Sequence, residues 1–242
     1  TAPTVKLLDE LKATRAELER LLASGRREPA GIPANDWRTK ATAFEKFDAG
    51  WRSRWDASGL GLRPEADLVT FPHSGQEVRK LPGAIRSPSF TIEKPYIAIR
   101  VAGKDGRARL VLNGLQLIQS PIYGDLAKPI NHGEELKWLV FSVSMWKGQS
   151  AYIELLDDGP GYVAISEAWF ADNPPPPDPS VKVPLPEIPV SDKPEAKPLI
   201  EKIRALEAKV PDAQRALTIR DGNAIDGQVF IRGSHKTLGI PA

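Results

Sequence analysis

Few side chains in this 242-residue chain have the types and spacing that catalysis requires. Hydrolytic chemistry needs convergent groups, either a pair of carboxylates or a nucleophile with a neighbouring base. The histidines, His73, His132 and His235, stand in no metal-binding spacing, and no serine lies in a Gly-x-Ser-x-Gly turn. The pair Asp157-Asp158 lies in a Gly/Pro-rich run, where aspartate is favoured for turn formation. The sequence therefore predicts that the chain is not an enzyme.

Binding by ring stacking and hydrogen bonding suits this chain better. It has six tryptophans and four tyrosines, and sugars offer apolar faces to flat rings and hydroxyls to fixed polar groups. Trp51, Trp138, Trp146 and Trp169 have apolar neighbours, so we expect them in the core. Trp55 is flanked by polar residues and is therefore a candidate to stack on a ligand.

One long segment is the first candidate for a loop that faces a ligand. Residues 119–133 are too polar and glycine-rich for a strand and too long for a simple turn. The alternative is a loop whose aromatic side chains only pin it to the fold. The candidate ligand-binding residues are Gln116, Tyr123, Asn131 and His132 in and beside this loop, together with Trp55 and Arg100.

The elements that must position these residues are mostly strands. Between about residue 40 and residue 173 apolar residues alternate with a period of two, as in 96–101, 109–112 and 151–155. Turn signals separate the runs at 103–106, 113–114, 147–148 and 157–161. Short strands at this spacing predict a mainly β fold, an antiparallel β-sandwich or jelly roll over residues 36–173.

A helix is expected at each end of this β region. Residues 1–30 carry leucines at three-, four- and seven-residue intervals, and Leu199, Ile203, Leu206 and Val210 repeat in the spacing of a coiled-coil seam within a helix over 199–211. Each apolar stripe is narrow, so we predict that the two helices pack as an antiparallel pair. The alternative is that each helix covers a separate part of the sandwich.

The segment between the sandwich and the second helix is rich in proline. Residues 174–198 cannot form the interior of a helix or sheet and predict an extended, semi-rigid strap in polyproline conformation. The tail, residues 212–242, contains the run 229–233, which we expect to be a single strand belonging to a following domain.

Composition limits the partners. The net charge of +2 implies no basic face and disfavours nucleic acid. The absence of cysteine excludes disulfides, c-type haem attachment and thiolate zinc sites within the chain. No apolar run approaches the roughly 20 residues that span a bilayer, so we expect no membrane span. The chain opens at Thr1 without methionine, as expected for a piece of a longer protein.

The central region resembles a known family. Residues 81–92 resemble the G-x-L-x-S-P-x-F-x-I opening of galactose-binding-like β-sandwiches, modules that accompany family 32 glycoside hydrolases and many exported bacterial proteins. The likeness continues through 97–103, 109–114, 141–151 and 153–157, and it closes at 161–170. The resemblance implies a carbohydrate-binding-module type of sandwich.

The wider arrangement is similar to that of large planctomycete proteins that join a cytochrome c-like region to two planctomycete-specific domains of unknown function. The residues that carry this likeness are 116–118, 121–124, 131–132 and 230–236. In those proteins such a sandwich lies between the two uncharacterised domains. The resemblance implies an exported protein, periplasmic or at the cell surface, and no haem-binding part lies in this chain.

Related sandwiches often hold a structural calcium ion near the entry of the chain and the last strand, with hard oxygen ligands. Glu45, Asp48 and Glu167 match those regions, so the resemblance implies them as metal ligands. Ser166 stands where the family usually has aspartate, which is a departure from the pattern.

Three classes of function follow. The first is a non-catalytic module that binds polysaccharide or oligosaccharide within a larger exported protein. The second is a structural spacer that packs on neighbouring domains of the same protein and binds no sugar; it predicts that Tyr123 and His132 are buried or face another domain. A glycan-degrading enzyme would require a cleft that gathers aspartate or glutamate pairs.

Overall fold

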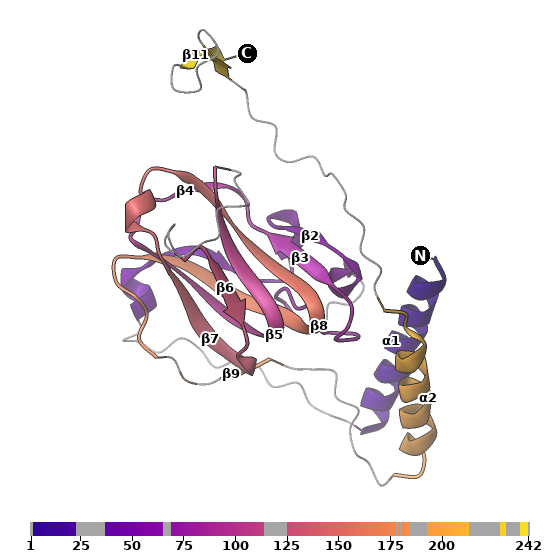
Figure 1. The fold of residues 1–242 in the computed structure, drawn as a ribbon. Helices are drawn as coiled ribbons and strands as arrows, with labels where there is room; N and C mark the ends of the chain where they lie inside the picture. Colours follow the sequence, from indigo (N-terminus) through magenta and orange to yellow (C-terminus); the bar gives the residue numbers. More distant parts are fainter. Residues whose placement is uncertain are drawn as a thin grey trace.

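Two long antiparallel strands form the centre of the fold (Figure 1). The structure, a computed structural model, describes residues 2–22, 37–64, 69–113, 125–177, 179, 181–183, 193–212, 228–230 and 238–241. Strands β5 (Tyr96–Leu112) and β8 (Ser150–Ala171) pair from end to end. Inward-facing residues such as Ile97 and Ile99 are at most 1% exposed. The predicted alternation therefore places apolar side chains on the core side of these strands.

Both long strands bend where the sequence predicts turns. Residues 103–106 stay within β5 and residues 157–161 stay within β8, so the prediction of turns there is wrong. The ladder shifts register between Lys104 and Gly106, which marks a bulge. A Cβ at Gly161 would lie 1.7 Å from the carbonyl oxygen of Lys104. Glycine is thus required because the two backbones approach each other at the bend.

Shorter strands flank each half of the bent pair. Beside the half that contains Tyr96 lie β7 (Gly133–Ser142) on β5 and β1 (Thr42–Lys46) on β8. Beside the other half lie β6 (Ala127–Ile130) on β5, with β3 (Gly83–Arg86) and β4 (Phe90–Thr91) on β8, and β2 (Asp56–Ser58) on β3. Single 3-10 turns lie at Trp37–Lys40, Trp51–Ser53, Leu60–Leu62 and Ser144–Trp146. The predicted class, mainly antiparallel β with a helix near each end, is confirmed.

Strand β6 lies inside the segment expected to be a loop. Leu126 and Ile130 are at most 1% exposed and belong to the core, which draws this part of the chain onto β5. Pro129 interrupts the apolar alternation, and a proline is tolerated on a short flanking strand. The loop prediction for residues 119–133 is therefore wrong for residues 127–130.

One apolar cluster joins both halves of the sheet. It contains Ile97 and Ile99 from one half of β5 and Leu110 and Leu112 from the other half. Phe44, Phe90 and Phe170 pack beside this cluster with ring centroids 4.9 Å apart.

Two of the four tryptophans predicted to be core residues are deeply buried. Trp51 is 1% exposed and Trp169 is 3% exposed. Trp138 and Trp146 are half-buried. For Trp138 and Trp146 the core prediction holds only in part, because apolar neighbours in the sequence do not tell how much of a ring is covered.

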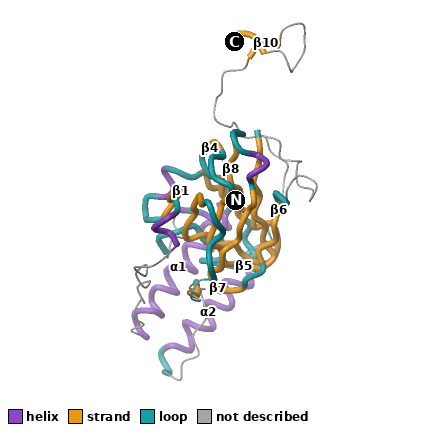
Figure 2. Tube along the Cα trace, turned by 90° about the vertical axis from the view of Figure 1, so that its left-hand side faces the viewer, coloured by secondary structure: helices purple, strands orange, loops and turns teal. Residues whose placement is uncertain are grey.

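The two helices pack on each other. Helices α1 (Ala2–Leu22) and α2 (Ala196–Lys209) lie side by side in Figures 1 and 2, and Figure 1 shows them running in opposite directions. They share a second apolar cluster, which contains Leu8, Leu11 and Ile203. Burial of each such side chain stabilises the fold by about 1.5–3 kcal/mol. Packing of the helices is thus confirmed, with α1 starting and ending inside the predicted 1–30 and α2 starting earlier than predicted.

The helix pair is also fixed to the β region. Arg63, which follows a 3-10 turn, donates two hydrogen bonds to Glu77 at 2.5 and 2.6 Å and one to Asp9 of α1 at 2.7 Å. Val78 and Leu81 join the apolar cluster of the helices. Because Arg63 and Glu77 are 7% and 6% exposed at their side chains, this ion pair is part of the packed interior.

Part of the proline-rich segment adds a strand to the sheet. Strand β9 (Val181–Lys182) pairs with β7, and Val183 is 3% exposed beside Leu136. The sequence predicted an extended strap that is excluded from the interior of a sheet, and β9 is a short strand at the edge, where residues 181–183 contain no proline. In the tail, β10 (Gln228–Phe230) pairs antiparallel with β11 (Leu238–Pro241), so the expected strand has a partner strand.

Among the described residues, no helix is long and apolar enough to cross a membrane.

Candidate ligand-binding site

The described residues considered for catalysis are held in structural contacts. Asp157 is 1% exposed within β8, and Asp158 forms an ion pair with Arg107 of β5. His73 is fully buried and accepts a hydrogen bond at Nδ1 from the backbone N–H of Gly75 at 3.0 Å. His235 lies outside the described residues. Nothing in these contacts assembles a nucleophile with a base.

Asn131 and His132 hold the start of β7 against the bend of β5. The Asn131 Oδ1 atom accepts a hydrogen bond from the backbone N–H of Asp105 at 2.8 Å, and Asp105 has a positive φ of 55°. The His132 Nδ1 atom lies 3.2 Å from the carbonyl oxygen of Val101. A carbonyl oxygen can only accept, so His132 donates through Nδ1. Asn131 and His132 therefore act first as anchors of the local backbone. Gln116 and Tyr123, the other two candidates in and beside the predicted loop, lie outside the described residues.

Trp55 is a core residue, which corrects its selection as a ligand-stacking residue. It is 2% exposed, and its ring centroid lies 4.9 Å from that of Phe47. Its Nε1–H donates to Glu45 at 3.1 Å. Trp51 and Trp55 are four residues apart, and the Trp55 backbone N–H donates to the Trp51 carbonyl, so both rings turn inward while the arginines between them face outward.

Arg100 links elements of the chain to one another, which is a structural setting that its selection as a ligand residue did not anticipate. Its guanidinium donates to Glu167 of β8 at 3.3 Å and to the carbonyl oxygen of Pro179 at 3.1 Å. The side chain is 13% exposed. It therefore connects β5, β8 and the proline-rich segment.

The three carboxylates expected to bind calcium are each engaged by arginine. Arg54 donates to both oxygens of Glu45 and to Asp48, all at 3.0 Å. The hydrogen bonds that Arg54 donates, to Glu45 first and then to Asp48, raise the pKa of Arg54. The bond from Arg54 in turn lowers the pKa of Asp48. Arg38 donates to both oxygens of Glu167 at 2.8 Å.

This donor set does not fit calcium. Calcium takes six to eight oxygen ligands, whereas the oxygens here face guanidinium groups, which would repel a second cation. The described residues contain no group of three or more acidic or histidine side chains that could hold a metal. Glu45, Asp48 and Glu167, which the resemblance implies as metal ligands, are ion-pair partners of arginine in this structure.

Three tryptophan rings, Trp37, Trp138 and Trp169, also have partners. Arg38 lies 4.8 Å from the ring centroid of Trp138, and Lys46 lies 4.8 Å from that of Trp169. The Trp37 ring meets Trp138 edge-on at 5.1 Å. These rings form a cation–π cluster on the outer side of the sheet, where guanidinium and ammonium groups already occupy the positions that a sugar would need.

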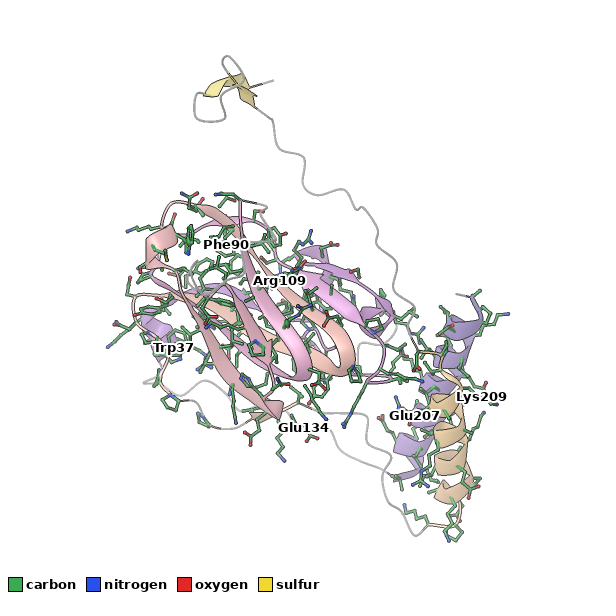
Figure 3. The ribbon with its side chains drawn as sticks, in the orientation of Figure 1. Trp37, Phe90, Arg109, Glu134, Glu207 and Lys209 are labelled. Atoms are coloured by element: carbon green, nitrogen blue, oxygen red, sulfur yellow. The ribbon has the colours of Figure 1, made fainter. Side chains whose placement is uncertain are left out.

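A polar pocket lies where the bend of the long strands meets β7 and β9. Its volume is about 340 Å³, at the small end of the range of roughly 300–1,000 Å³ found for ligand sites. Figure 3 shows Glu134 at the end of β7 that lies beside β9. The pocket is lined by Arg79, Lys104, Gly133, Glu134, Glu135, Tyr162 and Lys182. It begins one residue after His132, so the sequence located its edge but none of the side chains that line it.

Tyr162 is the buried polar group of this pocket. It is 2% exposed, and its hydroxyl has no hydrogen-bond partner among the described residues. Its ring stacks on His73, with centroids 5.3 Å apart and planes 15° apart. Burial raises the pKa of Tyr162, the charge of Glu134 raises it further, and Arg79 opposes this shift. The hydroxyl is thus neutral at physiological pH and keeps its proton.

Some residues that shape this pocket stand out in the sequence, but the sequence pattern predicts a different role for them. The glycines at 103, 106 and 161 look like turn residues, whereas they lie at the bend, where the backbones of β5 and β8 approach each other closely. Glu134, Glu135 and Lys182 are ordinary surface residues in the sequence, because only the pairing of β7 with β9 brings them together. Arg79 joins them from the segment before β3.

Comparisons with protein-family models, with curated proteins and with solved structures find no match to this chain.

Proposed function

We propose that this chain is a non-catalytic module that binds a polysaccharide or oligosaccharide at the Tyr162 pocket, within a larger exported protein. The β region would be a galactose-binding-like sandwich, as the resemblance of residues 81–92 implies. The observation that carries the proposal is the buried Tyr162 hydroxyl without a partner among the described residues, in the wall of a polar pocket.

The chemistry of this pocket suits a sugar. A buried hydroxyl that makes no hydrogen bond costs about 1–3 kcal/mol, and a sugar hydroxyl can supply the missing partner. Around it Glu134 offers acceptor oxygens, while Arg79 and Lys104 offer donors. Sugar hydroxyls both donate and accept, so a pocket with both kinds of group can fix their orientation.

The test is affinity electrophoresis of the chain through gels that contain single polysaccharides of plant and algal origin, followed by calorimetry for any that retard it. We expect retardation by at least one polysaccharide and weaker retardation of Tyr162→Phe, which removes only the hydroxyl. The matched control is Tyr96→Phe, which removes the same group outside the pocket. Tyr96 begins β5, whereas Lys104 lies at the bend beside the pocket. Unretarded migration across a broad panel would contradict the proposal.

A second candidate function is a structural spacer that binds no sugar. The observation that favours it is the buried ion pair of Arg63 with Glu77, extended to Asp9, which makes the helices and the β region one packed unit. A spacer predicts no retardation by any polysaccharide and a single unfolding transition seen by far-ultraviolet and near-ultraviolet circular dichroism. Retardation that depends on the Tyr162 hydroxyl would argue against it.

A further inference from the structure

The charges around the Tyr162 pocket are unequal. Three cationic side chains line it, Arg79, Lys104 and Lys182, against two carboxylates, Glu134 and Glu135. The three cations come from three different parts of the chain: the segment before β3, the bend of β5, and β9. A pocket that collects cations in this way favours a ligand with negative charge.

One of the two carboxylates is already neutralised. Glu135 forms an ion pair with Lys137, two residues further along the same edge of β7, at 2.7 Å. Residues i and i+2 of a strand lie on the same face. Glu134 is then the remaining acid of the lining, against three cations, and the pocket keeps a net positive charge.

The buried hydroxyl adds a donor of fixed position. Tyr162 is held by its stack on His73, so its hydroxyl cannot turn away to bulk water. The Arg79 guanidinium lies 5.9 Å from the ring centroid of Tyr162. A hydroxyl and a guanidinium on one wall are donors for the oxygens of a carboxylate or a sulfate, and arginine binds such groups in a bidentate manner.

The proline-rich segment completes the pocket. Lys182 lies opposite Glu135 in the β7–β9 ladder, and the backbone N–H of Val183 donates to the carbonyl oxygen of Glu134 at 2.8 Å. These two contacts hold Lys182 beside the pocket. The backbone of the third cationic residue is therefore fixed by main-chain pairing with β7.

We propose that the Tyr162 pocket recognises an anionic group on a saccharide, a uronate carboxylate or a sulfate ester, with Arg79, Lys104 and Lys182 supplying the charge and Tyr162 a hydrogen bond. This inference rests on the proposed saccharide-binding function and names the class of saccharide. Glu134 accepts from a neighbouring hydroxyl of the same sugar, which orients the ring.

The experiment compares polysaccharides in matched pairs that differ in charge. Polygalacturonate is paired with its fully methyl-esterified form, and a carrageenan is paired with its desulfated form. Calorimetry on the full chain is expected to show binding to one or both charged members and at least about tenfold weaker binding to the neutral member of the same pair. The pair that responds identifies carboxylate or sulfate as the recognised group.

Variants place the effect in the pocket. Lys104→Gln and Lys182→Gln are each expected to weaken binding of the charged polysaccharide about three- to tenfold, because each removes one charge-assisted contact. The control is Lys147→Gln, an exposed lysine that follows the 3-10 turn beyond β7 and changes the net charge equally. Its affinity is expected to stay that of the parent chain.

Other outcomes separate the two proposals. Equal binding of charged and neutral members overturns the anionic inference and leaves saccharide binding in place. An equal loss in Lys147→Gln also overturns it, because attraction would then come from general charge. No binding of any of the four polysaccharides, or of the wider panel, overturns the saccharide-binding function itself.

Discussion

The cation–π cluster around Glu167 and the Tyr162 pocket contain similar side chains but differ in whether their polar groups have hydrogen-bond partners. In the first, both Glu167 oxygens accept hydrogen bonds from Arg38, and one also accepts from Trp169. In the second, cations line a cavity beside a hydroxyl that has no partner among the described residues. Saturated polar groups hold strands together, whereas unsaturated ones leave interactions for a ligand. This difference, rather than the types of residue, separates the structural site from the candidate binding site.

The largest expected effect is a loss of stability when the cation–π cluster around Glu167 is broken. Glu167→Ala removes the partner of Arg38, whose side chain is 4% exposed, and of Arg100, and it leaves buried positive charge without that counter-charge. We expect a loss of about 3–5 kcal/mol in the free energy of unfolding, measured by denaturant titration with tryptophan fluorescence. The control is Glu93→Ala at an exposed position. A loss below about 1 kcal/mol would mean that the cluster is not a structural unit.

The next effect concerns the bend of β5 and β8, where the Tyr162 pocket lies. Gly161→Ala places a methyl group 1.7 Å from the Lys104 carbonyl oxygen, so the strands must move apart. We expect a loss of at least about 1–3 kcal/mol in the free energy of unfolding, together with loss of saccharide binding, because Lys104 and Tyr162 both lie at this bend. Gly50→Ala is the control, since its nearest neighbour is the exposed Asp48 side chain at 3.3 Å. A stable, binding-competent Gly161→Ala variant would contradict the close approach of the strands.

Removal of an unsatisfied group should cost little. Tyr162→Phe deletes a buried hydroxyl that makes no hydrogen bond with the described residues, so we expect a stability change within about 1 kcal/mol, toward a more stable fold. The measurement is the same denaturant titration without saccharide. A large loss would show that the hydroxyl has a structural partner, and the contrast with Glu167 would then disappear.

The pH dependence of stability tests the burial of the Tyr162 hydroxyl in a second way. Burial, reinforced by Glu134 and opposed by Arg79, raises the pKa of Tyr162 in the folded state above its unfolded value of about 10. The folded chain then binds more protons than the unfolded chain between the two pKa values, so its stability falls as the pH rises through that window. The contribution is fully present below about pH 10. Tyr162→Phe should show a smaller fall in unfolding temperature between pH 9 and pH 11, and equal falls would contradict the pKa shift.

Sequence patterns predicted the fold better than the site, for physical reasons. Alternation in 96–101 and the leucine stripe of α1 report burial directly, and both elements are present. Trp55 was misread because a 3-10 turn and a single carboxylate, Glu45, bury an indole whose chain neighbours are all polar. The pocket depends on the pairing of β7 with β9, a contact between distant segments that no local pattern encodes.

The smallest expected effect is none at all, and it tests the assignment of Glu45 and Asp48 as ion-pair partners. Arg54 already bridges both carboxylates at 3.0 Å, so an added cation would have to displace a guanidinium group. The unfolding temperature should therefore be the same in a calcium chelator and in millimolar calcium. Arg54→Gln provides the counterpart, because it removes the guanidinium from both carboxylates while keeping a polar side chain. A calcium-dependent rise in the parent chain would restore the metal site and would show that an arginine-saturated cluster can still take a ligand.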